Sequence, residues 1–152
     1  MSNASPLPRL AMVTSRFNTA ITDGLKRGAL ARLAVSHITV AEGDMFEVPG
    51  AYEVPLVAQR LARTGRYDGI IALGCVIKGE TAHFEFISLG ATMGTMQAML
   101  ATETPIAFGV ITTYKDEQAE ARAADGPHNS GGEAASACLE TLGILRRIAS
   151  AS

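Results

Sequence analysis

Residues 69–85 constrain the fold more than any other part of this sequence. Residues 69–73 form an uncharged apolar run, typical of a strand that is buried on both faces of a sheet. The chain then turns at Gly79, and a helical pattern follows with His83 expected one turn inside it. A strand that leads into a helix N-terminus leaves backbone N–H groups unpaired, and the helix dipole favours negative charge there. This arrangement predicts an anion site with His83 beside it as a proton-transfer group.

Strands and helices alternate along the chain. Apolar runs predict strands at residues 10–13, 37–41, 69–73 and 105–113. Periodic or capped segments predict helices at residues 19–34, 55–64, from the turn at Gly79 to residue 100, 115–124 and from Ser130 onward, where Ser130 and Glu133 have capping-box spacing. The alternation implies right-handed crossovers and a parallel four-stranded sheet between two helical layers, a three-layer α/β/α sandwich. Ligands bind such sheets at the carboxyl ends of the strands, here residues 17–18, 50–53, 76–83 and 112–114.

Composition sets the outer limits. At 152 residues, 47% hydrophobic and 18% charged, the chain is expected to be one globular domain over residues 1–152, with residues 1–8 flexible or derived from a tag. The net charge of -2 argues against nucleic acid or an anionic membrane surface as a partner. No apolar run approaches the ~20 residues of a membrane span, and the start is unlike a signal peptide.

The cysteines and histidines argue against two further classes of protein, those held by disulfides and those with a metal site. Cys75 and Cys138 lie in apolar segments and give no disulfide framework, which favours a reducing cytoplasm. His37, His83 and His128 lack the spacing of a metal site, so no metal is expected.

The helix at residues 86–100 carries no charge, and its large apolar side chains do not keep to one face. A helix that is apolar all round is buried all round. One small sheet covers only part of such a helix. We therefore expect a neighbouring subunit to cover the rest.

Each candidate residue has an ordinary structural interpretation as well. Phe17 suits either a hydrophobic staple or an aromatic plate for a flat ligand, and its residue type alone favours burial. Glu53 suits either the positive end of the next helix or hydrogen bonds from ligand hydroxyls. His83 suits a structural histidine or a base kept neutral by the helix N-terminus. Arg122 is by default a solvated surface residue. Cys75 after Gly74 permits a nucleophile elbow with His83 as base, although a small buried hydrophobe is the commoner role.

Six segments in order resemble the 6,7-dimethyl-8-ribityllumazine synthase family, over nearly the whole chain. They are residues 16–18, 48–55, 72–85, 105–113, 117–123 and 129–135. The resemblance implies a flavodoxin-like sheet and a transferase of riboflavin biosynthesis. That enzyme condenses 5-amino-6-(D-ribitylamino)uracil with 3,4-dihydroxy-2-butanone 4-phosphate and needs no cofactor.

The resemblance also implies roles for particular residues. Phe17 would stack on the pyrimidine, and His83 would serve proton transfers. The remaining substrate-binding residues would be Ala51, Tyr52 and Glu53 along the ribityl chain, Val76, Ile77 and Lys78 before the turn, Gly79, Glu80, Thr81 and Arg122 at the phosphate, and Phe108 from a neighbouring subunit.

Some features depart from the family pattern. Ser130 stands where many relatives carry a lysine that contacts the pyrimidine from the next subunit, so Ser130 is expected only to cap the last helix. This weakens the predicted pyrimidine binding and leaves open a non-catalytic homologue that holds a lumazine or flavin. The family forms pentamers and icosahedral shells. The turn at residues 124–129 and the proline-containing start favour a free homopentamer or a decamer here.

Overall fold

A computed structural model describes residues 5–151 of the chain. Residues 1–4, half of the segment expected to be flexible or tag-derived, lie outside the described residues. The strands are β1 (Leu10–Ser15), β2 (Met45–Val48), β3 (Gly69–Ile77) and β4 (Ile106–Thr113). The helices are α1 (Thr19–Val35), α2 (Val54–Arg63), α3 (His83–Thr102), α4 (Asp116–Ala123) and α5 (Ser130–Ser150), with short 3₁₀ turns η1 (Glu42–Asp44) and η2 (Ala51–Glu53).

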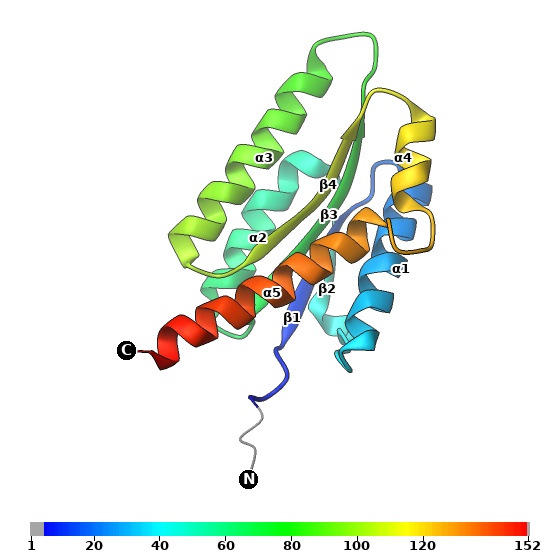
Figure 1. Ribbon diagram of the computed structural model, residues 1–152. Coiled ribbons are helices and arrows are strands. Elements are labelled where there is room, and N and C mark those ends of the chain that lie inside the picture. The colour runs from blue at the N-terminus through cyan, green and yellow to red at the C-terminus, as the bar shows by residue number, and fades with distance from the viewer. Residues whose placement is uncertain (1–4, 152) are drawn as a thin grey trace.

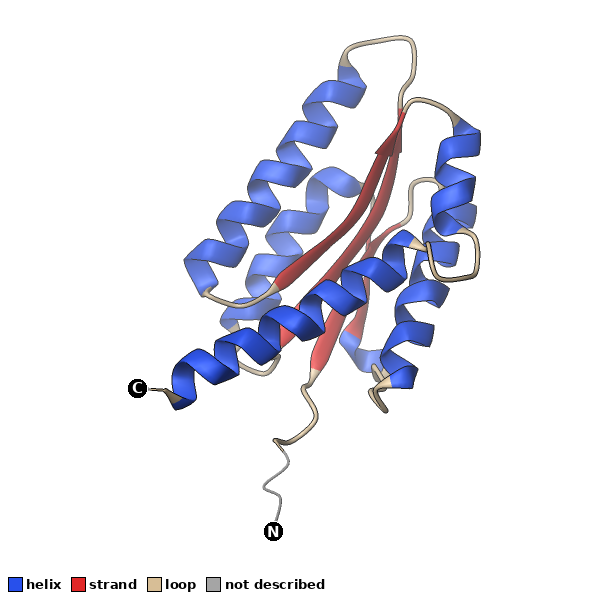
Figure 2. Cartoon of the chain, viewed as in Figure 1, coloured by secondary structure: helices blue, strands red, loops and turns tan. Residues whose placement is uncertain are grey.

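The four strands form one parallel sheet in the order β2-β1-β3-β4 (Figure 1). Helices α2 and α3 cover one face, and α1, α4 and α5 cover the other (Figure 2). The central strand β3 is buried from Gly69 to Cys75, which explains its uninterrupted apolar sequence. The predicted three-layer α/β/α sandwich with a parallel four-stranded sheet is therefore confirmed.

The position predicted for the second strand is wrong. The second strand is Met45–Val48, which pairs with Met12 to Ser15 of β1, whereas residues 37–41 form a loop. Ile38 and Val40 are buried two residues apart, as in a strand, but they pack beneath α1 from that loop. His37 has φ 60°, a left-handed conformation that ends the preceding helix and interrupts any strand there.

Two helix starts also differ from the predictions. His83 is the first residue of α3 and does not lie one turn inside it. Helix α5 is capped by Asn129, whose side-chain oxygen accepts hydrogen bonds from the Gly131 and Gly132 N–H groups. The expected cap at Ser130 is therefore wrong, and Ser130 is the first helical residue.

Helix α3 separates small from large side chains. Its buried face consists of Ala91, Thr95 and Ala98, so the helix lies close to the sheet. Its outer face carries a stripe of exposed hydrophobic residues with spacings of 3 and 4, which we call the α3 stripe: Phe86, Leu89, Met93, Met96 and Leu100. Each of these is at least half exposed in the single chain. The single chain therefore leaves one face of this helix uncovered.

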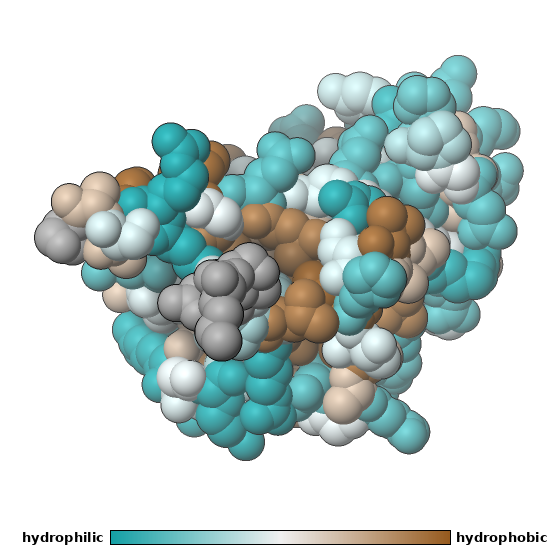
Figure 3. All heavy atoms as spheres, turned by 60° about the horizontal axis from the view of Figure 1, so that its bottom comes forward, coloured by the Kyte–Doolittle hydropathy of each residue, from teal (hydrophilic) through white to brown (hydrophobic). Residues whose placement is uncertain are grey.

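A partly buried charged cluster lies at the opposite, amino edge of the sheet. The Arg9 guanidinium donates to Asp44 Oδ1 at 2.9 Å and to Oδ2 at 3.2 Å, and the Tyr67 hydroxyl donates to Oδ1 at 2.7 Å. These hydrogen bonds lower the pKa of the Asp44 carboxyl, that from Arg9 most strongly. Figure 3 views this edge, where hydrophobic side chains gather at the centre and hydrophilic ones surround them. The cluster joins the starts of β1, β2 and β3.

Candidate active site

A pocket of about 490 Å³ lies at the carboxyl edge of the sheet. It is formed by the ends of β1 and β3, the β2–η2 connection and the first turn of α3. Nine of the predicted site residues line it: Phe17, Ala51, Tyr52, Glu53, Val76, Ile77, Gly79, Thr81 and His83. Pro49, Gly50, Cys75, Phe84 and Ile87 complete the lining. Segments that are far apart in the sequence thus meet where the parallel topology predicts a ligand.

The turn between β3 and α3 is suited to an anion. Within residues 5–151 no protein acceptor is found for the N–H groups of Gly79, Glu80 and Thr81, and no side chain caps α3. The His83 N–H donates to Thr81 Oγ1 at 3.3 Å. These residues are exposed at the positive end of a 20-residue helix. The turn can therefore bind a phosphate group through its backbone, with the His83 imidazole next to it.

Phe17 is 71% exposed, so its role as a buried or staple residue is excluded for the single chain. It follows β1 directly, and its N–H donates to the Pro49 carbonyl at 3.2 Å. The next residue, Asn18, adopts a left-handed conformation, and its side chain donates to the Cys75 carbonyl at 3.1 Å. Asn18 thereby joins the end of β1 to the end of β3. An exposed aromatic ring is held at the mouth of the pocket.

Tyr52 and Glu53 enter the pocket from η2. The Tyr52 ring lies against α3 at Gly90, where a β-carbon would be 2.9 Å from the ring atom Cε2. The Glu53 carboxylate accepts a hydrogen bond from the Gly50 N–H, with Oε2 and N separated by 3.1 Å. This hydrogen bond is local and lies at the start of a helical segment, in line with the structural role considered for Glu53. The exposed carboxylate also lines the pocket. Both roles of Glu53 are compatible with the geometry.

Cys75 is buried, which argues against a nucleophilic role. Its side chain is 2% exposed, and burial, with a smaller contribution from Asp116, raises the pKa of the thiol to about 12. The thiolate is the reactive form of cysteine, so near pH 7 this side chain is a neutral apolar lining group. Burial likewise raises the pKa of Cys138 to about 12.

Four of the predicted residues do not line the pocket of the single chain. Lys78 and Glu80 belong to the same turn but are not part of the lining, and the Lys78 ammonium lies 5.7 Å from the centre of the Tyr114 ring. Phe108 lies on the edge strand β4 and is 40% exposed. Arg122 is exposed on α4, where its guanidinium donates to the Gln118 carbonyl of its own helix at 3.0 Å.

Sequence reasoning missed several lining residues. Phe84 and Ile87 follow His83 within one turn of α3, so the helical period alone could have placed Ile87 on the same side as His83. Asn18 belongs to the predicted edge segment 17–18, but no local pattern predicts the hydrogen bond from its side chain to the Cys75 carbonyl. A second hollow, between α1, α5 and residues 125–127, is lined by none of the predicted residues.

Two further observations concern the described part of the chain. It contains no group of three or more His, Cys, Asp or Glu side chains arranged to hold a metal ion. None of its helices combines the length and the apolar character needed to cross a membrane.

The fold and the pocket define an α/β protein with a pocket at the carboxyl edge of a parallel sheet, beside a turn whose backbone N–H groups have no acceptor within the described residues. Residues 8–146 match the sequence model of the 6,7-dimethyl-8-ribityllumazine synthase family. The 6,7-dimethyl-8-ribityllumazine synthase 1 of Caulobacter vibrioides is 63% identical over 93% of this chain and 92% of its own length. The synthases of Deinococcus radiodurans and Salinibacter ruber are 49% and 44% identical, each over 92% of this chain and 90% of their own lengths. The chain belongs to the 6,7-dimethyl-8-ribityllumazine synthase family, which confirms the resemblance drawn from its sequence.

Proposed function

We propose that this chain is a transferase of riboflavin biosynthesis. It condenses 5-amino-6-(D-ribitylamino)uracil with 3,4-dihydroxy-2-butanone 4-phosphate to give 6,7-dimethyl-8-ribityllumazine, phosphate and water. The observation that carries this proposal is the 63% identity to a synthase over nearly the full length of both chains. The meeting of three separate segments in one pocket supports it.

The pocket suits both halves of the reaction. The exposed Phe17 ring stacks on the pyrimidine, and Ala51, Tyr52 and Glu53 hold the ribityl chain. The N–H groups of Gly79 to Thr81 bind the phosphate. Holding two reactants together supplies about 7–11 kcal/mol of the barrier reduction in well-oriented systems.

His83 performs the proton transfers. The reaction forms an imine, loses phosphate and closes a ring, and each step moves a proton at a nitrogen, oxygen or carbon atom. The imidazole of the first residue of α3 lies at the pocket and next to the phosphate turn. The amine of the pyrimidine is itself the nucleophile, so no covalent residue and no cofactor is needed.

The active enzyme is a homopentamer, or a decamer built from pentamers. The α3 stripe repeats at spacings of 3 and 4, the pattern that packs one helix against another. In this assembly Phe108 and Arg122 complete a neighbour's pocket, which agrees with their exposure outside their own. Arg122 adds charge-assisted hydrogen bonds to the phosphate.

A reducing compartment, the cytoplasm, suits this protein. Both cysteines are buried as free thiols, and no disulfide is present in the described residues. Free thiols persist where the environment is reducing.

The decisive experiment incubates the purified protein with both substrates and follows lumazine fluorescence and phosphate release. We expect one phosphate for each lumazine formed. The alternative, a non-catalytic homologue, is suggested by Ser130 in place of the family's lysine. Tight binding of the lumazine without turnover at saturating substrate would favour that alternative and contradict the proposed activity.

A further inference from the structure

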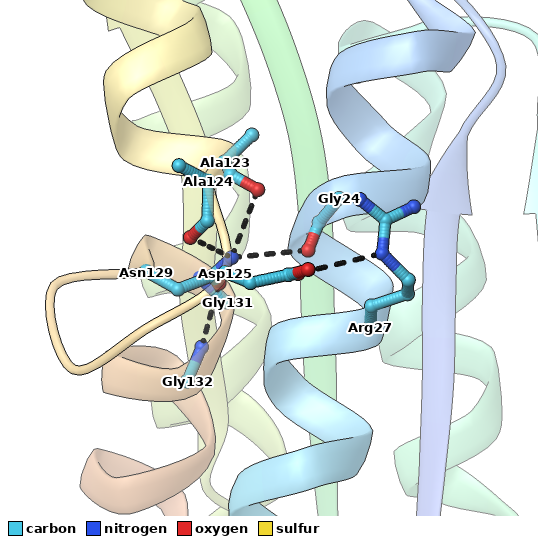
Figure 4. Close-up of polar contacts among 8 residues, drawn as sticks. All are labelled: Gly24, Arg27, Ala123, Ala124, Asp125, Asn129, Gly131 and Gly132. Carbon is cyan, nitrogen blue, oxygen red and sulfur yellow. Dashed lines mark hydrogen bonds and ion pairs between the residues drawn. The ribbon is translucent and has the colours of Figure 1, made fainter.

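Asn129 lies at the meeting point of three helices. It precedes α5, and its side chain is buried between α5, the end of α4 and the middle of α1 (Figure 4). Its exposure is 2%, the lowest among the buried polar residues after Ser15 and Thr22. The predicted active site does not include it.

The Asn129 amide makes two sets of hydrogen bonds. Its nitrogen donates to the carbonyl oxygens of Gly24 at 3.0 Å and of Ala123 and Ala124 at 3.1 Å. Its oxygen accepts from the N–H groups of Gly131 at 2.8 Å and Gly132 at 3.1 Å. One set therefore holds the end of α4 against α1, and the other caps α5 (Figure 4).

The surrounding glycines show how closely these elements approach. A β-carbon at Gly24 would lie 2.5 Å from the Ala123 carbonyl oxygen, and one at Gly28 would overlap the Asn129 amide. A β-carbon at Gly131 would overlap the carbonyl group of Leu25. The backbones of α1, α4 and α5 thus approach one another closely around the Asn129 side chain.

Helix α4 depends on this contact for its position. It has only eight residues, too few for a stable helix by itself. Its two buried side chains, Ala119 and Ala123, face the core. At its C-terminal end, the carbonyl oxygens of Ala123 and Ala124 accept hydrogen bonds from the Asn129 side chain. Arg122 precedes Ala123 directly and lies on the exposed side of the same turn.

We propose that Asn129 is the positioning residue for Arg122. By fixing the carbonyl groups of Ala123 and Ala124, it sets where the Arg122 guanidinium enters the phosphate site of the neighbouring subunit. This inference rests on the proposed role of Arg122 as a phosphate ligand. The inference concerns the amide nitrogen of Asn129, which donates to the α1 and α4 carbonyl groups. The amide oxygen caps α5.

Asn129→Asp tests the hydrogen bonds of the amide nitrogen separately from those of the amide oxygen. The carboxylate still accepts hydrogen bonds from the α5 N–H groups, but an oxygen replaces the nitrogen that faces three carbonyl oxygens. We expect KM for the butanone phosphate to rise about tenfold, the size of one lost hydrogen bond to a charged group. KM for the pyrimidine and kcat should change little. Asp125→Asn, in the same turn, removes an exposed ion pair with Arg27 and should leave every constant unchanged.

The test is a double-mutant cycle with Arg122→Ala in the assembled protein. If Asn129 acts through Arg122, Asn129→Asp raises this KM in the wild-type background and has no effect beside Arg122→Ala. An equal rise in both backgrounds, or no rise in either, would overturn the inference. If Arg122→Ala itself leaves KM unchanged, the proposed role of Arg122 is wrong and the inference fails with it.

Folding of the variants is checked by thermal unfolding and sedimentation. Should Asn129→Asp not unfold cooperatively, Asn129→Ser, whose hydroxyl can also cap α5, is judged by the same criteria. If neither variant folds, the amide supports the whole fold, and a specific role toward Arg122 is overturned.

Discussion

Tyr52 lies across Gly90, and the ring leaves no space for a side chain at that position of α3: a β-carbon there would be 2.9 Å from Cε2 and 3.2 Å from Cδ2. Gly90 occupies a helix interior, where alanine is favoured over glycine by about 1 kcal/mol. The space that an alanine methyl group would need is instead occupied by the ring of Tyr52, which lines the pocket.

Gly90→Ala should displace the Tyr52 ring without unfolding the protein. The ring is 62% exposed and free to move, so stability should stay unchanged or increase slightly. We expect KM for the pyrimidine substrate to rise about two- to tenfold, the range of one aromatic contact. Gly143→Ala on α5 is the control, since nothing lies within 4 Å of that position. Equal KM values in both variants would contradict a role for the ring position.

His83→Ala should slow turnover. Loss of a positioned proton-transfer group costs about 10²- to 10⁴-fold in rate, and we expect this loss in kcat with KM for both substrates nearly unchanged. Steady-state lumazine formation measures both constants. His37→Asn is the control: His37 is exposed in the loop after α1, and asparagine tolerates its positive φ. A His83 variant with full kcat would remove the imidazole from the mechanism.

Met96→Lys should disrupt the assembly. A lysine in the middle of the α3 stripe would have to lose its hydration between packed helices, at a cost of several kcal/mol. Sedimentation velocity should show single chains in place of the oligomer, with a loss of activity because the pocket lacks its neighbour. Ala101→Lys, also exposed on α3 but outside the stripe, should leave the mass unchanged. Intact oligomers of the Met96 variant would mean that the stripe is not the interface.

Asp44→Asn should destabilise the protein in a pH-dependent way. The hydrogen bonds from Arg9 and then Tyr67 lower the pKa of Asp44 in the folded state. The carboxylate therefore contributes stability above its unfolded pKa of about 3.9, and this contribution is lost as the pH falls through the folded pKa. The melting temperature of the variant should lie below that of the wild type at pH 7, and the gap should shrink below about pH 4. Asp23→Asn, at an exposed site of α1, should show no such convergence.

The sequence was most informative where a run of residues was uniformly apolar and was followed by a clear turn signal. The apolar run at residues 69–73 predicted a buried strand, and β3 is buried there; the turn that follows at Gly79 lies in the lining of the pocket at the carboxyl edge. The second strand was harder, because Ile38 and Val40 alternate like strand residues while the true strand, Met45–Val48, contains the exposed Glu47. Pairing with β1, which no local pattern encodes, decides between them.

The cap of α5 shows a similar limit. Ser130 and Glu133 have the correct spacing for a capping box, but the adjacent Asn129 caps the helix because its amide also bonds α1 and α4. Such long-range partners cannot be predicted from the neighbouring residues. The limit is greater for Arg122 and Phe108, because neither side chain lines the pocket of its own chain. Their proposed contacts lie in a neighbouring subunit.

The cluster of Arg9, Asp44 and Tyr67 lies at the edge of the sheet opposite to the pocket. The hydrogen-bonded cluster and the pocket lining are therefore separate groups of side chains, one at each end of the same strands. A lineage adapting to acid or heat could vary the first group while its chemistry stays the same, and protein engineers have the same freedom.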